Sequence, residues 1–238
     1  MSEATTADPL RPVYLSFGGG VNSVALMLWL RDQGREFETV YADHGCDWPE
    51  TREYVANLRA KGYPITVLET RRNNLTLLEW CLKYRIMPDL RQRWCTEEFK
   101  VKPIRGYIQQ PCTVYLAIAA EEAHRCKPSG NEDIEHQFPL IEEGIDRAEC
   151  RHIIEAHGLP VPPKSTCYFC PMQSGKDIVR LRTVHPDLFC KVQQMEQALN
   201  ERRAGKKPYY LYRKPVAQVA QSDQLDLFGE RTQCMCGL

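Results

Sequence analysis

Residues 12–30 have the sequence PVYLSFGGGVNSVALMLWL, in which three glycines separate two apolar runs. The first run, residues 12–17, is short and ends at glycine, which is typical of a buried strand. Helical periodicity starts at Ser23 and stops at Gly34, a residue type that commonly caps the end of a helix. A strand, a glycine-rich turn and a helix therefore follow one another, as in a unit of a parallel α/β sheet.

Strands and helices continue to alternate along the chain. We predict strands over residues 37–42, 64–69 and 113–119, and helices over residues 50–61 and 75–84. This spacing is typical of crossover units and predicts an α/β fold with a parallel sheet. Past residue 126, loop signals alternate with short helices, and no further strand is predicted. We place a nucleotide-binding core at residues 1–140 and a smaller, mainly helical, cysteine-bearing region at residues 141–238.

The 238 residues include 31 Lys and Arg and 31 Asp and Glu, so the formal net charge is zero. This balance excludes a globally basic protein that coats nucleic acid. No apolar run approaches the roughly 20 residues that a membrane helix needs, and the N-terminus lacks the basic and apolar segments of a signal peptide. We therefore expect a cytoplasmic protein with no membrane partner.

The charges are unevenly distributed although their sum is zero. Residues 83–105 hold seven basic and three acidic side chains, and residues 176–214 hold ten basic and four acidic ones. The intervening residues 121–150 are acidic, with nine carboxylates against three basic groups. The two basic segments can bind phosphate-rich ligands, or they can be the solvated faces of helices.

Eleven cysteines are the one unusual feature of the composition. An odd number without a signal peptide indicates reduced thiols rather than a disulfide framework. Cys167 and Cys170 form a CxxC in CYFCP, a spacing that zinc sites, iron–sulfur sites and redox dithiols share. A thioredoxin-type dithiol is disfavoured because it opens a helix directly after a strand, whereas this one follows PVPPKST. Metal ligation needs further thiolates, and the candidates are Cys95, Cys190, Cys234 and Cys236.

The glycine-rich turn SFGGGVNS, residues 16–23, favours binding of a phosphate group. Successive glycines let backbone N–H groups point inward, and the N-terminus of the following helix adds a positive field. Ser23 is expected to cap this helix and to place its hydroxyl beside the phosphate. The turn is neither a Walker A loop nor a GxGxxG fingerprint. The alternative is a turn that only lets the strand and the helix pack closely.

The same turn resembles the PP-loop, usually SGGxDS, of the ATP pyrophosphatase superfamily, with Gly18 in place of the serine and Asn22 in place of the aspartate. YADHGCDWPET (41–51), RWCTEEFKVKPI (93–104) and AAEEAHR (119–125) resemble blocks of the phosphoadenylylsulfate (PAPS) reductase branch. FPLIEEGIDRAEC and KSTCYFCPMQS resemble a block with CxxCP in phage and bacterial relatives. These blocks stand in family order over nearly the whole chain.

The resemblance implies an adenine nucleotide alpha-hydrolase-like fold, with an open, mostly parallel five-stranded-type sheet and helices on both faces. It implies that ATP binds with its β,γ-phosphates on the loop, bridged by Mg²⁺. The implied ATP-binding residues are Ser16, Phe17, Gly18, Gly19, Gly20, Asn22, Ser23 and Asp43. Asp43 ends the second predicted strand, where open α/β sheets place ligands, and is expected to bind ribose or to order the metal.

The resemblance also implies a catalytic set of Asp43, Cys95, Lys100 and Arg125. Arg93, Lys100 and Lys102 either contact the α-phosphate or an anionic substrate, or they lie on a solvated helix. Arg125 is the stronger candidate because it follows a predicted strand and is flanked by acidic residues. His124 is expected to be packed or solvated.

Superfamily members that thiolate nucleic acids resemble this cysteine arrangement, with one cysteine in the RxCT block and a later CxxC. The resemblance implies a [4Fe–4S] cluster on Cys95, Cys167, Cys170 and a fourth thiolate, Cys236, with Cys190 and Cys234 as alternates. A structural Zn²⁺ on four of these thiolates is the alternative. Ordinary thiols are expected at Cys46, Cys81, Cys112, Cys126 and Cys150.

We therefore expect an ATP pyrophosphatase that adenylates an acceptor oxygen, releases pyrophosphate and prepares the acceptor for sulfur insertion. The resemblance favours DNA over tRNA as acceptor, a cysteine desulfurase as sulfur donor, and further modification-system subunits as partners. PAPS reductase is the first alternative, although CMCGL lacks the Glu and His of the ECGxH-like motif of that enzyme. A non-catalytic, zinc-stabilised nucleotide-binding module is the second, because Gly18 and Asn22 alter the loop.

Overall fold

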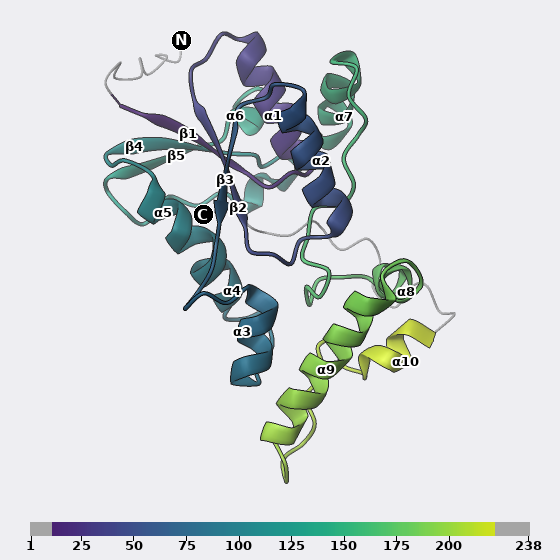
Figure 1. The fold of residues 1–238 in the computed structure, drawn as a ribbon. Helices are drawn as coiled ribbons and strands as arrows, with labels where there is room; N and C mark the ends of the chain where they lie inside the picture. Colours follow the sequence, from purple (N-terminus) through teal and green to yellow (C-terminus); the bar gives the residue numbers. More distant parts are fainter. Residues whose placement is uncertain (1–10, 222–238) are drawn as a thin grey trace.

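The computed structural model describes residues 11–221. Its five strands form one open sheet in which every pairing is parallel, in the order β3-β2-β1-β4-β5 (Figure 1). The strands are β1 (Val13–Phe17), β2 (Glu38–Asp43), β3 (Ile65–Glu69), β4 (Cys112–Leu116) and β5 (Ile134–Gln137). The predicted α/β class and parallel sheet are confirmed.

Helices cover both faces of the sheet (Figure 1). Those between strands are α1 (Val21–Asp32), α2 (Pro49–Ala60), α3 (Leu77–Tyr84), α4 (Trp94–Thr96) and α5 (Lys102–Tyr107), and α6 (Pro139–Glu142) and α7 (Arg147–Ala156) follow the last strand. A π-helical turn, η1 (Glu97–Val101), joins α4 to α5, and a 3₁₀ helix, η2 (Ala120–Arg125), follows β4. The chain then forms α8 (Gly175–Val184), α9 (Pro186–Arg202) and α10 (Val216–Gln221).

Side chains of each strand alternate between two apolar layers. Leu15 and Phe17 of β1 are buried with residues of α1, α2 and α7 on one face. Tyr14 is buried on the other face with Ile104 of α5 and Ile108 just after it. Because both faces are covered, the central strands β2, β1 and β4 are mostly buried and rich in apolar residues, as in other sheets with this layering.

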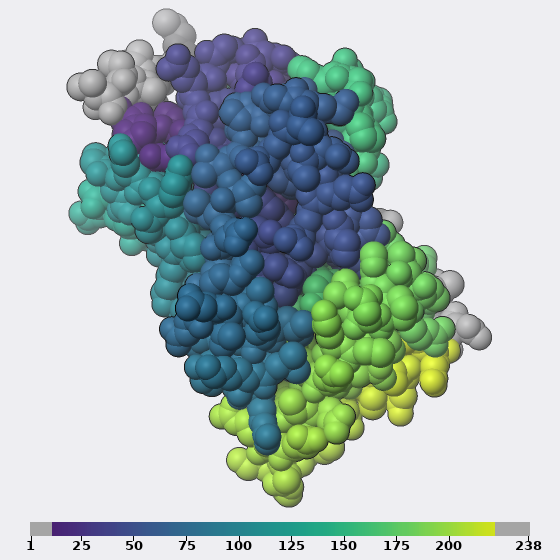
Figure 2. Space-filling view, in the orientation of Figure 1, coloured from purple at the N-terminus to yellow at the C-terminus, as the bar shows by residue number. Residues whose placement is uncertain are grey.

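A third apolar cluster holds the C-terminal helices against earlier segments of the chain. Ile178 of α8 and Met195 of α9 are fully buried in it together with Leu77 of α3 and Phe99 of η1. Figure 2 shows this lobe in green and yellow beside the blue surface of the α3 region. The predicted boundary near residue 140 stays a prediction.

Two local predictions are wrong. β5 lies in the region where no further strand was expected, because its sequence IEHQ is a short edge strand with only Ile134 buried and has no apolar run. Ser23 does not cap α1: the helix begins two residues earlier, and Gly20, in extended conformation, is its N-cap. Ser23 is instead the third residue of the helix, and its hydroxyl donates back to the Gly20 carbonyl at 3.0 Å.

Within residues 11–221, none of the helices is both long enough and apolar enough to span a membrane.

Candidate functional site

The glycine loop lies at the carboxyl end of β1, in the middle of the sheet, where the chain crosses to α1. Gly19 has a left-handed backbone with φ +69°, and a Cβ there would lie 2.9 Å from Cγ2 of Val55. Glycine is therefore required at this position by conformation and by space. Ser16 and Gly18 line a small cavity with Ala42 at the end of β2. Open α/β sheets bind their ligands at this edge.

The loop continues into a polar network at the start of α1. Asn22, which is 5% exposed, donates from Nδ2 to Oε2 of Glu122 at 3.4 Å, and its own Oδ1 has no partner. Arg125 pairs with Glu122 across 2.5 Å. A buried amide oxygen without a partner fits a ligand that brings a donor or a cation. His124 is exposed, in agreement with the prediction that it is packed or solvated.

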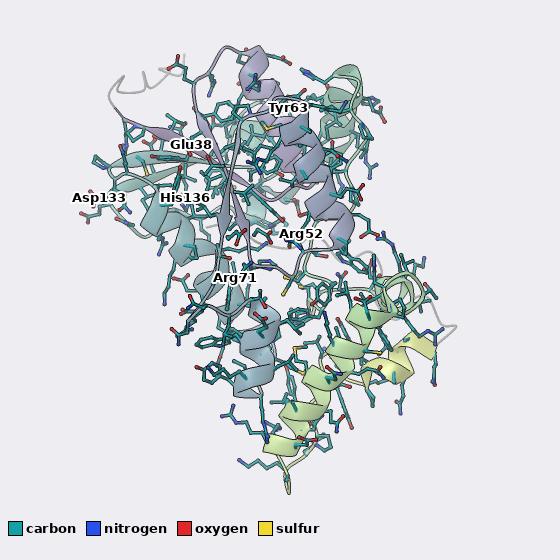
Figure 3. All side chains as sticks on the ribbon, in the orientation of Figure 1. Glu38, Arg52, Tyr63, Arg71, Asp133 and His136 are labelled. Atoms are coloured by element: carbon teal, nitrogen blue, oxygen red, sulfur yellow. The ribbon has the colours of Figure 1, made fainter. Side chains whose placement is uncertain are left out.

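Asp43 is engaged by protein groups. Its Oδ2 accepts from Nε and Nη2 of Arg52 at 3.2 and 2.9 Å, and its Oδ1 accepts from the Gly45 N–H at 2.8 Å. Arg71 holds the Asp43 carbonyl at 3.1 Å. Figure 3 shows Arg52 and Arg71 near the junction between the sheet and the C-terminal helices. Asp43 thus ties the end of β2 to α2 and to the turn at Gly45.

The CxxC loop is attached to the segment that follows β2. Two backbone hydrogen bonds tie them together: Trp48 N–H donates to the Thr166 carbonyl at 3.2 Å, and Tyr168 N–H to the Cys46 carbonyl at 3.0 Å. Ser165 hydrogen-bonds through its hydroxyl to the Gly18 carbonyl. These contacts place the CxxC beside the glycine loop, although about 150 residues separate the two motifs in sequence.

Three thiols from two distant parts of the chain line one cavity, which we call the thiol cavity. Cys95 comes from α4, and Cys167 and Cys170 come from the CxxC loop. Lys100 of η1 lines this cavity and also the cavity of the glycine loop, so one side chain connects the two. A π-helical turn at this point is typical of a functional site.

The sulfurs of the three cysteines do not form a compact set. In the described part of the chain, the one set of three His, Cys, Asp or Glu ligand atoms that all lie within 4.8 Å of one another is His44, Asp47 and Cys167. At least one pair of the three cysteine sulfurs is therefore more than 4.8 Å apart.

The cavity wall holds a buried ionic network. Nε2 of His44 lies 3.2 Å from Oδ1 of Asp47 and 3.4 Å from Sγ of Cys167, and Nζ of Lys100 lies 3.7 Å from the same Asp47 oxygen. Nδ1 of His44 accepts the Cys46 N–H at 3.1 Å, which assigns the proton to Nε2. Tyr41 donates to Oδ2 of Asp47 at 2.7 Å. His44 therefore presents its Nε2 hydrogen to the Cys167 sulfur and is no base for the thiol.

Burial and charge act in opposite directions in this network. Burial raises the pKa of Cys95, Cys167 and Cys170, and for Cys167 the neighbouring Asp47 raises it further. Burial alone would lower the pKa of Lys100, but Asp47 and the three thiols outweigh it and the pKa is raised. Lys100 is thus a cation beside three thiols whose ionisation is opposed by burial. Such thiols become thiolates when a bound metal ion or cluster displaces their protons.

The remaining predicted residues are less uniformly placed. Arg93 is half-buried and lines the thiol cavity, and burial, together with Arg125, lowers its pKa. Lys102 is exposed and pairs with Glu98, as on a solvated helix. Cys190 is exposed on α9 and does not line the thiol cavity. Cys234 and Cys236 lie outside the described residues.

Phe17 is buried against Tyr41. The thiols that were expected to be ordinary ones are buried at Cys46, Cys81, Cys112 and Cys150 and partly buried at Cys126.

Sequence reasoning missed His44, Asp47 and Ser165. His44 and Asp47 lie in the run YADHGCDWPET, directly after a predicted strand, and this position at the carboxyl end of the sheet was the available signal. No sequence pattern singles out Ser165, because its role depends on a contact with a residue 147 positions away.

No family model matches the chain. It is 32% identical over 101 residues to the uncharacterized protein MJ0066 of Methanocaldococcus jannaschii, covering 42% of this chain and 20% of that protein. It is 24% identical over 193 residues to the uncharacterized protein MJ0973 of the same organism, covering 74% of this chain and 45% of that protein. The chain thus spans less than half the length of these relatives.

A similar solved structure is the phosphate complex of PAPS reductase from Candida auris. The TM-score is 0.51 at 14% sequence identity, over 65% of this chain and 76% of that one. This likeness shows a PAPS reductase-like fold, which confirms the coarser part of the predicted resemblance. At this identity it carries no statement about activity.

Proposed function

We propose that the chain is an ATP pyrophosphatase that adenylates an acceptor oxygen for sulfur insertion into nucleic acid, with DNA before tRNA as acceptor. The observation that carries the proposal is the juxtaposition of the glycine-loop cavity and the three-thiol cavity, with Lys100 in the wall of both. The reaction has two steps, adenylation of the acceptor and insertion of sulfur, and these need a nucleotide site next to a site that holds sulfur.

The glycine loop and the N-terminus of α1 would bind the phosphates. Backbone N–H groups around Gly18 and Gly20 and the positive end of the helix favour an anion, and Lys100 adds a cation on the opposite wall. The acceptor oxygen attacks the α-phosphorus, and the bond to pyrophosphate breaks. Sulfide then displaces AMP from the adenylated acceptor. Charge that develops on phosphate oxygens is stabilised best by groups already in place.

Cys95, Cys167 and Cys170 would hold a [4Fe–4S] cluster, with Cys236 as the proposed fourth ligand and Cys234 as the alternate. Cys190 is exposed on α9 away from this cavity and therefore serves as the control. Such a cluster supplies the means to carry sulfur for transfer. The protein contributes a donor from Nε2 of His44 toward Cys167 and the positive charge of Lys100. Hydrogen bonds and charges near the ligating sulfurs shift the reduction potential of such a cluster.

PAPS reductase is the second candidate, because a solved structure of that enzyme shares the fold. The two candidates differ in product: one releases pyrophosphate from ATP, and the other releases sulfite from PAPS. A non-catalytic module would form neither product.

The test uses full-length protein purified without oxygen and supplied with ATP, Mg²⁺, DNA, a cysteine desulfurase with cysteine, and dithiothreitol to reduce persulfide sulfur to sulfide. Pyrophosphate release is measured, and the digested DNA is analysed by mass spectrometry for sulfur. We expect both products from the wild type and from Cys190→Ala. Cys95→Ala and Cys167→Ala should lose sulfur incorporation while still binding ATP. Sulfur incorporation at the wild-type rate by either variant overturns the proposal. So does sulfite release, without thiolation, in a parallel reaction that contains PAPS and a dithiol reductant in place of ATP.

A further inference from the structure

A third cavity, of about 450 Å³, lies next to the thiol cavity. It is formed by the segment 209–213, by Leu90 and Arg91, and by Pro171 and Gln173. We call it the tyrosine groove. It shares Asp89, Leu90 and Pro171 with the lining of the thiol cavity, so the two cavities have a common wall. Its volume is in the range of small-molecule sites.

The tyrosine groove combines flat apolar surface with positive charge. Tyr209 and Tyr210 are half-buried, and Leu90 at its rim is 49% exposed. Arg91 and Arg213 are exposed. The sequence 203–214 around the groove carries five basic and no acidic residues. Aromatic faces between cations are the arrangement with which proteins bind unpaired nucleic-acid strands.

The groove is held in shape by several local contacts. Tyr209 donates its hydroxyl to Asp89 at 3.3 Å, and its backbone exchanges hydrogen bonds with the Asn200 side chain at 2.9 and 3.1 Å. Arg213 has a left-handed backbone with φ +64°, which is costly for a residue other than glycine, and its N–H donates to the Tyr210 carbonyl at 3.3 Å. Strain of this kind persists where the surrounding structure enforces it, and it clusters at binding sites.

Two buried side chains of the groove have unused hydrogen-bonding capacity. Tyr212 is 7% exposed and Gln173 is 4% exposed. The Tyr212 hydroxyl and Oε1 of Gln173 have no partner. Buried polar atoms are rarely left unpaired, and the polar edge of a nucleobase offers both donors and acceptors. Burial raises the pKa of Tyr212 well above its usual value, and Cys170 raises it further.

We propose that the tyrosine groove binds an unpaired nucleotide of a single-stranded nucleic acid, with the base against Tyr209 or Tyr210 and the phosphates at Arg91 and Arg213. The inference deepens the proposed function, on which it rests: the groove would present the acceptor strand to the neighbouring thiol cavity. An enzyme that modifies a nucleotide must take it out of the duplex stack or receive it single-stranded.

The test is binding of a fluorescein-labelled oligothymidine of about 12 nucleotides to full-length protein, measured by fluorescence anisotropy without ATP. We expect tighter binding than to a duplex of the same length. Tyr210→Ala and Arg213→Glu should each weaken binding roughly tenfold, as loss of a stacked base or a phosphate contact does. Tyr210→Phe keeps the ring and should bind like the wild type. An oligouridine in parallel distinguishes RNA from DNA; tighter binding of either supports the groove.

The matched controls are Tyr63→Ala and Arg31→Ala. Arg31 lies 5.6 Å from the ring centroid of Tyr63, and Figure 3 shows Tyr63 at the end of the molecule opposite the C-terminal helices. Both controls should leave the affinity unchanged. Equal losses of oligonucleotide affinity in the controls and the groove variants, or wild-type affinity in Arg213→Glu, would overturn the proposal that the groove binds the strand. Because binding is measured without ATP, failure of thiolation alongside intact groove binding sinks the proposed function and leaves the groove supported.

Discussion

Gly18 and Gly19 are adjacent in the glycine loop but differ in what a side chain would meet. A Cβ at Gly19 would lie 2.9 Å from Val55 and 3.2 Å from Thr51, whereas a Cβ at Gly18 has no atom within 4 Å. Of these two glycines, Gly19 alone has a positive φ. The glycine-rich pattern predicted the loop, but it could not tell which glycine the fold requires, because that depends on α2.

This difference makes a paired prediction. Gly19→Ala should lower the free energy of unfolding by about 2 kcal/mol, because a left-handed alanine costs about 1–2 kcal/mol and the overlap with Val55 adds to it. Gly18→Ala should leave it unchanged. Urea unfolding measures both, and equal stability of the two variants would contradict the geometry of the loop.

Lys100 and Lys102 are a second matched pair. Lys100 neutralises the fully buried Asp47, and Lys100→Met leaves that carboxylate without its cation, which should cost about 3 kcal/mol. Lys102 makes only an exposed pair with Glu98, so Lys102→Met should cost under about 1 kcal/mol. Thermal unfolding of both variants is the measurement. Equal losses would show that Asp47 does not depend on Lys100.

Ser23 acts on the loop from inside α1. Its hydroxyl donates to the Gly20 carbonyl and accepts the Gly20 N–H, so it fixes the turn that a phosphate would meet. Ser23→Ala should weaken ATP binding measured by calorimetry. Thr183→Ala, which removes an exposed hydroxyl bonded within α8, is the control. An unchanged dissociation constant for ATP in Ser23→Ala rejects the assignment of the loop.

At the scale of elements, the alternation of apolar runs predicted four strands, three of them to within one residue at each end, whereas β4 ends three residues before the predicted end. β1 and β3 each begin one residue later than predicted and end where predicted. β5 was missed because an edge strand of four residues needs no apolar run: its register is set by hydrogen bonds to β4. The attachment of the CxxC loop to residues 46–48 was equally beyond sequence reasoning, since backbone hydrogen bonds leave no residue-type signal.

The contact between α9 and α10 predicts a pH dependence of stability. Glu196 of α9 is 7% exposed; burial raises its pKa, although Oε2 accepts the Val216 N–H at 3.0 Å. A carboxyl whose pKa is higher in the folded state binds its proton more tightly there and so stabilises the folded protein. This contribution is fully present below the unfolded-state pKa, about 4.3, and is lost as the pH rises through the folded-state pKa. Glu196→Gln should therefore be more stable than the wild type near neutral pH, and the difference should shrink toward about pH 4.

Thermal unfolding across this pH range is the measurement, with Glu201→Gln as control. Glu201 is on the same helix but exposed, so its variant should follow the wild-type profile. A pH-independent difference for Glu196→Gln would show that its carboxyl is not forced to protonate.

At the scale of the whole molecule, three cavities lie in a row: the glycine-loop cavity, the thiol cavity and the tyrosine groove. Lys100 is shared by the first two, and Asp89, Leu90 and Pro171 by the last two. The resemblance predicted the first cavity and the three thiols. It did not predict the groove or the ionic network of His44 and Asp47, which arise only when distant segments pack together.

The most direct test of the central proposal, that Cys95, Cys167 and Cys170 form one cluster site beside a nucleotide loop, is the content of iron, sulfide and zinc in protein purified without oxygen. We expect about four irons and matching sulfide per chain, lost in alanine variants of these three cysteines and retained in Cys190→Ala. One zinc and no iron, or free thiols with neither metal, would contradict it.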